Sequence, residues 1–213
     1  MRSRTRRAFD AVLVAAALFA TRAAHAGSCD ELVASARAHE AAGDRDVALR
    51  QYNDAVTLDP TCEPAWLGLG ALRERAGDAA EAERVYDAAL LHVPTLSAAV
   101  AGRARSRYRL GRAEEAEEDM RGYAERLVAH DPRAALAAFV ELASWYTAQG
   151  RPPAELACWR RIADVARGVD PALEARARTT STALALVVAS ADPVTHPPRG
   201  GLLRSVAARL RLR

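Results

Sequence analysis

Residues 66–94 decide the fold of this chain. They read Trp66-x2-Leu69-Gly70-x2-Arg73, then Gly77, then Ala82-x3-Tyr86-x2-Ala89, and close on Pro94. Gly77 stands midway between Gly43 and Gly111, at an interval of 34 positions on either side, and the same interval separates Tyr52 from Tyr86. A chain that repeats its helix breakers and its aromatic residues in step is built from repeated helix pairs.

The residue types at the repeated positions suit helices that pack closely. Gly43, Gly77, Gly111 and Gly150 are predicted to end the first helix of each pair, because glycine adopts the left-handed cap conformation without a Cβ penalty. Small residues let two helices approach, and the aromatic residues fill the space up to the next pair. At each unit boundary, aspartate can cap the following helix and proline suits its first turn. These dipeptides are Asp59-Pro60, Asp131-Pro132 and Asp170-Pro171.

This pattern resembles the tetratricopeptide repeat over residues 29–170. The unit of residues 66–94 matches best, with Arg73 where the family has tyrosine. The earlier unit matches at Leu32, Ser35, Ala36, His39, Gly43, Ala48, Tyr52, Ala55 and Pro60. A weaker third unit has Val100, Ala104, Gly111, Ala116, Met120 and Tyr123, with Arg103 and Arg107 where apolar or aromatic residues are usual. A fourth has Phe139, Leu142, Ala143, Tyr146 and Gly150 and then departs, with Glu155 and Trp159 in its second helix.

The resemblance implies an all-α fold, a right-handed α-solenoid of about four antiparallel helix pairs. A capping helix is expected after Pro171, up to about residue 189. The interval lengthens along the chain, to 38 positions from Pro94 to Pro132 and to 39 from Pro132 to Pro171. About one extra helical turn is therefore expected in each of the last two units.

Residues 1–26 have the charge, length and order of a secretory signal peptide. Arg2, Arg4, Arg6 and Arg7 precede an apolar run, and Ala24-His25-Ala26 supplies a cleavage site. We therefore expect export, with a periplasmic or extracellular location after cleavage near Ala26. An uncleaved membrane anchor and lipid attachment at Cys29 are the alternatives.

Charge excludes a basic nucleic-acid-binding domain. All 30 basic residues are arginine. Without residues 1–26, which hold five arginines and Asp10, 25 arginines stand against 26 acidic residues. The repeat domain, residues 27–192, has 20 arginines and all 26 of those acids, whereas residues 193–213 have five arginines and no acid. Nucleic-acid binding therefore loses its compositional support.

The basic segment divides into a linker, residues 193–201, and an amphipathic tail helix, residues 202–213. Its apolar residues fall on one helical face: Leu202, Leu203, Val206, Ala207 and Leu210. Such a helix can lie on anionic lipid or dock in a groove. The alternative is a frayed end, or a tail that folds back on the acidic body.

Three cysteines follow the predicted leader. Cys29 and Cys62 are one position short of a full repeat apart, so both are expected near the starts of adjacent first helices. In an oxidising compartment they either form a disulfide or remain separate buried thiols. Cys158 is expected to be a small core residue.

No catalytic, cofactor or metal site is predicted. The histidines are isolated and lack metal-ligand spacing, and no phosphate loop or nucleophile elbow is present. The three tryptophans are most simply core residues. The chain is therefore not expected to be an enzyme.

The resemblance instead implies a protein or peptide partner on the concave face that the first helices line. Uncommitted residues there are Arg37, Glu40, Leu67, Glu74, Arg75, Arg105, Tyr108 and Arg109. Arg105, Tyr108 and Arg109 form the densest patch, since arginine holds carboxylates and tyrosine adds a flat contact. A solvated helix face is the alternative. The prediction is a non-catalytic interaction scaffold of the cell envelope. A membrane-surface assembly factor anchored by the tail is the second hypothesis, and an accessory envelope enzyme the third.

Overall fold

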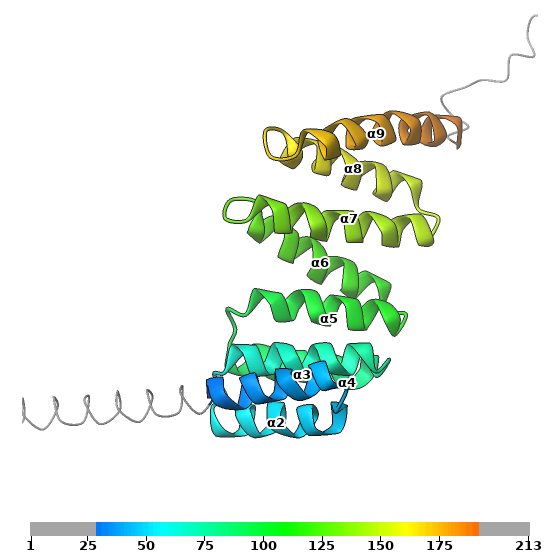
Figure 1. Ribbon diagram of the computed structural model, residues 1–213. Coiled ribbons are helices and arrows are strands. Elements are labelled where there is room, and N and C mark those ends of the chain that lie inside the picture. Colours follow the sequence, from blue (N-terminus) through cyan, green and yellow to red (C-terminus); the bar gives the residue numbers. More distant parts are fainter. Residues whose placement is uncertain (1–28, 192–213) are drawn as a thin grey trace, which may run out of the picture. The chain divides into compact units, whose positions relative to one another are not determined.

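The computed structural model describes residues 29–191, and these form helices joined by short turns. Residues 29–42 are helical, and the later helices are α2 (Arg45–Leu58), α3 (Glu63–Arg75), α4 (Ala79–His92), α5 (Ser97–Arg109), α6 (Ala113–Leu127), α7 (Pro132–Ala148), α8 (Pro152–Ala166) and α9 (Pro171–Ala191). Consecutive helices run antiparallel within each part of the chain (Figure 1). No strand occurs between residues 29 and 191. The prediction of an all-α fold built from antiparallel helix pairs is confirmed. The predicted signal peptide, linker and tail helix lie outside the described residues.

The chain forms two compact units, which divide within α6 between Tyr123 and Ala124. The first unit contains residues 29–42 and α2 to α5, together with most of α6. The second contains the end of α6 and α7 to α9. The term first helix denotes the leading member of a pair: residues 29–42, α3, α5, α7 and α9.

Glycine closes the first helices as expected. Gly43, Gly77, Gly111 and Gly150 all have positive φ, between 63° and 89°. Each is followed by a second helix that begins two positions later. The regular spacing of these glycines therefore sets where every pair reverses direction.

Two of the three Asp-Pro dipeptides cap and start a helix as expected, and the third does not. The carboxylates of Asp131 and Asp170 accept hydrogen bonds from the backbone N–H groups of Ala134 and Leu173, at 3.0 and 2.9 Å, and proline is the first residue of α7 and of α9. The expectation is wrong at Asp59. This carboxylate accepts from Thr61 instead, and α3 begins only at Glu63, after Cys62 as its N-cap. Residues 60–62 intervene and leave Asp59 too far from the helix to cap it.

Much of the added length of the fourth unit lies in its first helix. The helix α7 has 17 residues, whereas α3 and α5 have 13 each. The difference is about one helical turn, as the longer interval predicts.

The core of the first unit combines small residues with aliphatic and aromatic ones. Tyr86 is 3% exposed, and its ring lies against Gly70 of α3 and Gly102 of α5. Tyr52 stands in the same relation to Gly68. A disulfide joins Cys29 to Cys62, with Cα atoms 6.3 Å apart, and so ties the start of residues 29–42 to the start of α3. Cys158 is buried and outside the disulfide, and its thiol donates to the carbonyl of Phe139.

Candidate functional site

Acidic and basic residues near the ends of the first helices pair with one another. Arg75 of α3 forms a salt bridge and hydrogen bond with Glu40 of the preceding first helix. One repeat later, Nη1 of Arg109 lies 3.7 Å from Oε2 of Glu74 and donates to the Glu74 carbonyl at 3.3 Å. Each pair joins residues 35 positions apart, so the pattern repeats with the chain. We call these two pairs the ion-pair ladder.

A buried tyrosine hydroxyl stands behind each rung. Tyr52 donates to Oε2 of Glu40 at 3.2 Å. Burial and the adjacent Glu40 carboxylate raise the pKa of Tyr52. The pKa of Tyr86 is raised in the same way, mainly by burial and further by the charge of Glu74. Both phenols therefore stay protonated at neutral pH and can donate to the carboxylate in front of them.

The first rung borders a hollow of about 320 Å³. It is lined by three small residues, Ala41, Gly68 and Ala71, and by the polar residues Arg37, Glu40, Tyr52 and Arg75.

The remaining predicted groove residues lie in the same unit. The charge of Arg105 offsets part of the rise in the pKa of Tyr86, so Arg105 lies near this phenol. Arg105 and Tyr108 are half-buried and have partners of their own. Leu67 is partly buried and packs against the hydrophobic core. The structure thus brings Glu40 to Arg75, Glu74 to Arg109, and Arg105 to their vicinity. Four of the eight predicted residues therefore form ion pairs with one another.

A second set of charges was recognised from the sequence only as departures from the repeat pattern. Arg103 and Arg107 of α5 replace residues that are apolar or aromatic in the family. The Arg103 guanidinium binds Asp119 through Nε and Nη2, both at 2.8 Å, and Asp87 through Nη1 at 3.0 Å. Arg107 binds Glu83 at 2.9 Å and Asp119 at 2.8 Å.

Arg112 completes this network. It binds both carboxylate oxygens of Glu83, at 2.6 and 2.7 Å, and pairs with Glu115. The side chains of Glu83, Asp119 and Arg107 are only 11%, 12% and 16% exposed. The first two turns of α6 therefore contribute Glu115 and Asp119 to an ionic network that joins α4, α5 and α6. The sequence did not single out Glu83, Asp87 or Asp119 as partners of these arginines, because charged residues are common on helix surfaces.

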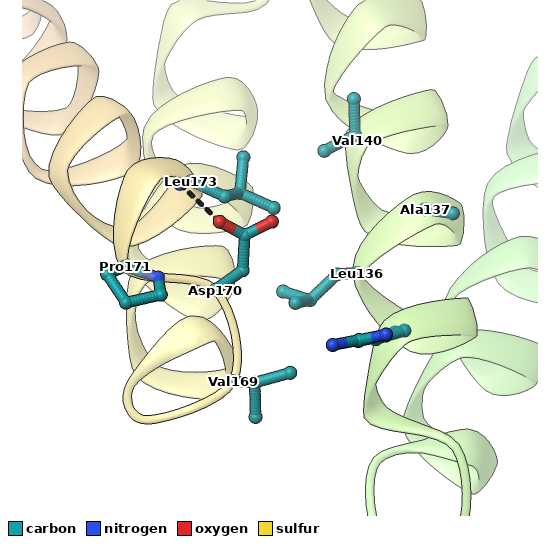
Figure 2. Close-up of a pocket in the computed structure, with 8 residues that line it drawn as sticks. Leu136, Ala137, Val140, Val169, Asp170, Pro171 and Leu173 are labelled. Carbon is teal, nitrogen blue, oxygen red and sulfur yellow. Dashed lines mark hydrogen bonds between the residues drawn. The ribbon is translucent and has the colours of Figure 1, made fainter.

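The second unit has an apolar hollow of about 540 Å³ between α7 and the start of α9 (Figure 2). Leu136, Ala137 and Val140 line it from α7, and Val169 and Leu173 from the other side. Asp170 faces it but is committed to capping α9 through Leu173 (Figure 2). Arg133 lines the hollow and is exposed. Sequence reasoning missed this feature, because its residues belong to two first helices that are a full unit apart in the chain.

Within residues 29–191, no group of three or more His, Cys, Asp or Glu side chains is arranged to hold a metal ion. In the same range, no helix has the length and apolar character needed to cross a membrane.

Comparison with known proteins agrees with the architecture. A family model described as Tetratricopeptide repeat matches residues 30–72. No curated protein matches the chain. Among solved structures, TPR-like repeats described as those of a Podosopora anserina putative kinesin light chain are 15% identical with a TM-score of 0.60, over 84% of this chain and 92% of that one. The MamA protein is 14% identical with a TM-score of 0.56, over 74% of this chain and 86% of the other. At these identities the likeness shows the fold.

Proposed function

We propose that the chain, which belongs to the tetratricopeptide repeat family, is a non-catalytic scaffold of the cell envelope that binds a peptide or protein segment on its first helices. The observation that carries this proposal is the ion-pair ladder beside the hollow of the first unit. Charged groups of both signs line a solvent-open concavity there, and arginine can hold a carboxylate supplied by a partner.

The partner favoured by this geometry is a segment with acidic residues. Arg75 is exposed at 51% and Arg109 at 47%, so both guanidiniums keep unused N–H donors toward solvent. A partner carboxylate can bind these donors while Glu40 and Glu74 remain in place. In the second unit, the hollow of Leu136, Ala137 and Val140 suits an apolar side chain of the same partner or another.

Location in the envelope rests on two further features. Residues 1–26 have the order of a secretory signal. The Cys29–Cys62 disulfide suits an oxidising compartment. Exported protein that retains Met1 and lacks the disulfide would contradict this part of the proposal.

Affinity capture from the exported fraction tests the binding site. The wild-type chain is compared with Arg105→Glu/Arg109→Glu and with a control, Arg84→Glu, whose side chain is 74% exposed on the second helix α4. We expect the double variant to lose a partner that the wild type and the control both retain. Circular dichroism shows whether the double variant is folded. Capture of every partner by a folded double variant would reject the assignment of the site.

A further inference from the structure

The last two turns of α9 expose an apolar face. Ala183, Leu186, Val187 and Ser190 follow the spacing i, i+3, i+4, i+7, and all four are exposed. Leu186 is 70% and Val187 is 50% exposed, the largest apolar side chains left open on this helix. The opposite face packs on α8, where Ala177 is fully buried. A helix that closes an array is expected to turn a polar face to solvent. Within residues 29–191, nothing covers this apolar face.

The position of Leu186 within the repeat shows which side of α9 carries this apolar face. The helices α7 and α9 begin alike, each with a capping aspartate followed by proline, so Pro132 and Pro171 occupy equivalent positions. The interval of 39 positions between these prolines also makes Thr147 of α7 equivalent to Leu186 of α9. Thr147 lies three positions before Gly150, as Glu40 lies three before Gly43 and Glu74 three before Gly77. Leu186 therefore holds the register position of the ladder carboxylates, with an apolar side chain in their place.

We propose that residues 202–213 dock as an amphipathic helix on this face of α9. These residues lie outside the described part of the chain, and their sequence supplies the complementary surface. Leu202, Leu203 and Val206 open an apolar stripe that continues through Ala207 and Leu210. Ala183 and Ser190 are small, which lets a second helix approach α9 closely around Leu186 and Val187.

The chain is long enough for this contact and short enough to favour it. Residues 192–201 separate α9 from the stripe. Ten residues span at most about 35 Å when extended and about 17 Å as a flexible coil. The face from residue 183 to residue 190 is about 11 Å long at the helical rise. A tether of this length gives an effective concentration in the millimolar range. A helix of twelve residues is marginal alone in water, so the contact with α9 would also stabilise it.

The charges on this part of α9 also permit residues 202–213 to dock there. Residues 180–191 contain no charged side chain, so no basic group on this part of α9 repels Arg204 or Arg209. The carboxyl end of α9 carries the negative end of the helix dipole, which favours nearby arginine. The docked tail would cover the first-helix face of α9, so a partner that uses this face would have to displace it.

Hydrogen exchange of the purified chain tests the contact. We expect amides of residues 183–191 to exchange about tenfold faster in Val206→Asp/Leu210→Asp than in the wild type, because the cover is lost. Ala208→Asp is the control, since residue 208 lies opposite the apolar stripe and its change should leave exchange unaltered. Equal exchange in the wild type and the double variant would overturn the proposal.

A reciprocal experiment changes α9 instead. Leu186→Asp/Val187→Asp alters exposed side chains, so the repeats should stay folded, and trypsin should then cut after Arg204 and Arg209 faster than in the wild type. Thr182→Asp, also exposed on α9, is the control. Protection that rises with protein concentration would place the tail on a second copy and overturn the intramolecular contact. Binding of the tail to phosphatidylglycerol vesicles, with unchanged exchange in α9, would overturn it in favour of a membrane surface.

Discussion

The ring of Tyr86 lies so close to Gly102 that a Cβ at residue 102 would be 2.5 Å from its Cε2 atom and nearer still to Cζ. Gly70 meets the same ring, with Cε1 and Cζ each 2.5 Å from the Cβ position. Two first helices, α3 and α5, therefore close on one tyrosine of α4. This contact explains why glycine is tolerated inside both helices, where it would otherwise be unfavourable.

Gly102→Ala should destabilise the first unit, although alanine is the better helix former. The ring cannot retreat, because it is held by α3 as well, and overpacking of this kind lowers the free energy of unfolding by about 1–3 kcal/mol. Urea unfolding measures the change. Tyr86→Leu/Gly102→Ala is the matched test, since a smaller side chain should recover part of the loss. A Gly102→Ala chain that is more stable than the wild type would show that the ring moves freely.

Arg107→Met should lower the free energy of unfolding by about 3 kcal/mol. The change leaves Glu83 and Asp119, both nearly buried, without one of their cations. Arg84→Met is the control, because the Arg84 side chain is 74% exposed and pairs with Glu81 on the same helix, and such pairs contribute about 0.5 kcal/mol. Equal losses in the two variants, measured by urea unfolding, would mean that the network adds no more than a surface pair.

Alkaline pH should destabilise the chain through Tyr86. The fold raises the pKa of this phenol above its ordinary value of 10.0, so the folded chain keeps the proton that the unfolded chain gives up. Stability from this group is fully present below pH 10 and is lost as pH rises from 10 toward the raised pKa. Tyr86→Phe removes the titrating group. The free energy of unfolding should therefore fall less between pH 9 and pH 11 in the variant than in the wild type, and parallel curves would contradict the assignment.

Reduction of the Cys29–Cys62 bond should lower the free energy of unfolding by about 3–4 kcal/mol, as loop-closure entropy gives for a sequence separation of 33. Unfolding in the presence and absence of reductant measures this. The Cys29→Ser/Cys62→Ser chain should match the reduced wild type and should not respond to reductant. A response in that variant would point to Cys158, which is buried and unbonded to another cysteine.

Much of the helix-pair arrangement could be predicted because it depends on local chemistry. Gly77 and Gly111 must adopt positive φ wherever their neighbours lie, and Pro132 and Pro171 suit a first turn for the same reason. Asp59 shows the limit of such reasoning: its dipeptide is the same, but the next helix starts too late for it to cap.

The candidate site could be predicted only in part, because the partner of a charged side chain is not a local property. Glu40 and Glu74 were expected to face a ligand, whereas their pairing with arginines of the next first helix was not expected. Arg103 and Arg107 stood out as departures, but several acids of α4 and α6 were equally available to them by sequence.

The sequence by itself determined the repeat, the places where helices end and the small-against-aromatic packing, because each depends on the conformational limits and size of single residues at a fixed spacing. The tertiary structure decided which carboxylate each arginine holds, and it left Leu186 and Val187 open on α9. Those outcomes depend on distances between helices that are far apart in the chain. The energy of an ion pair depends on the distance between its two charges, and the sequence alone does not give that distance for each possible carboxylate.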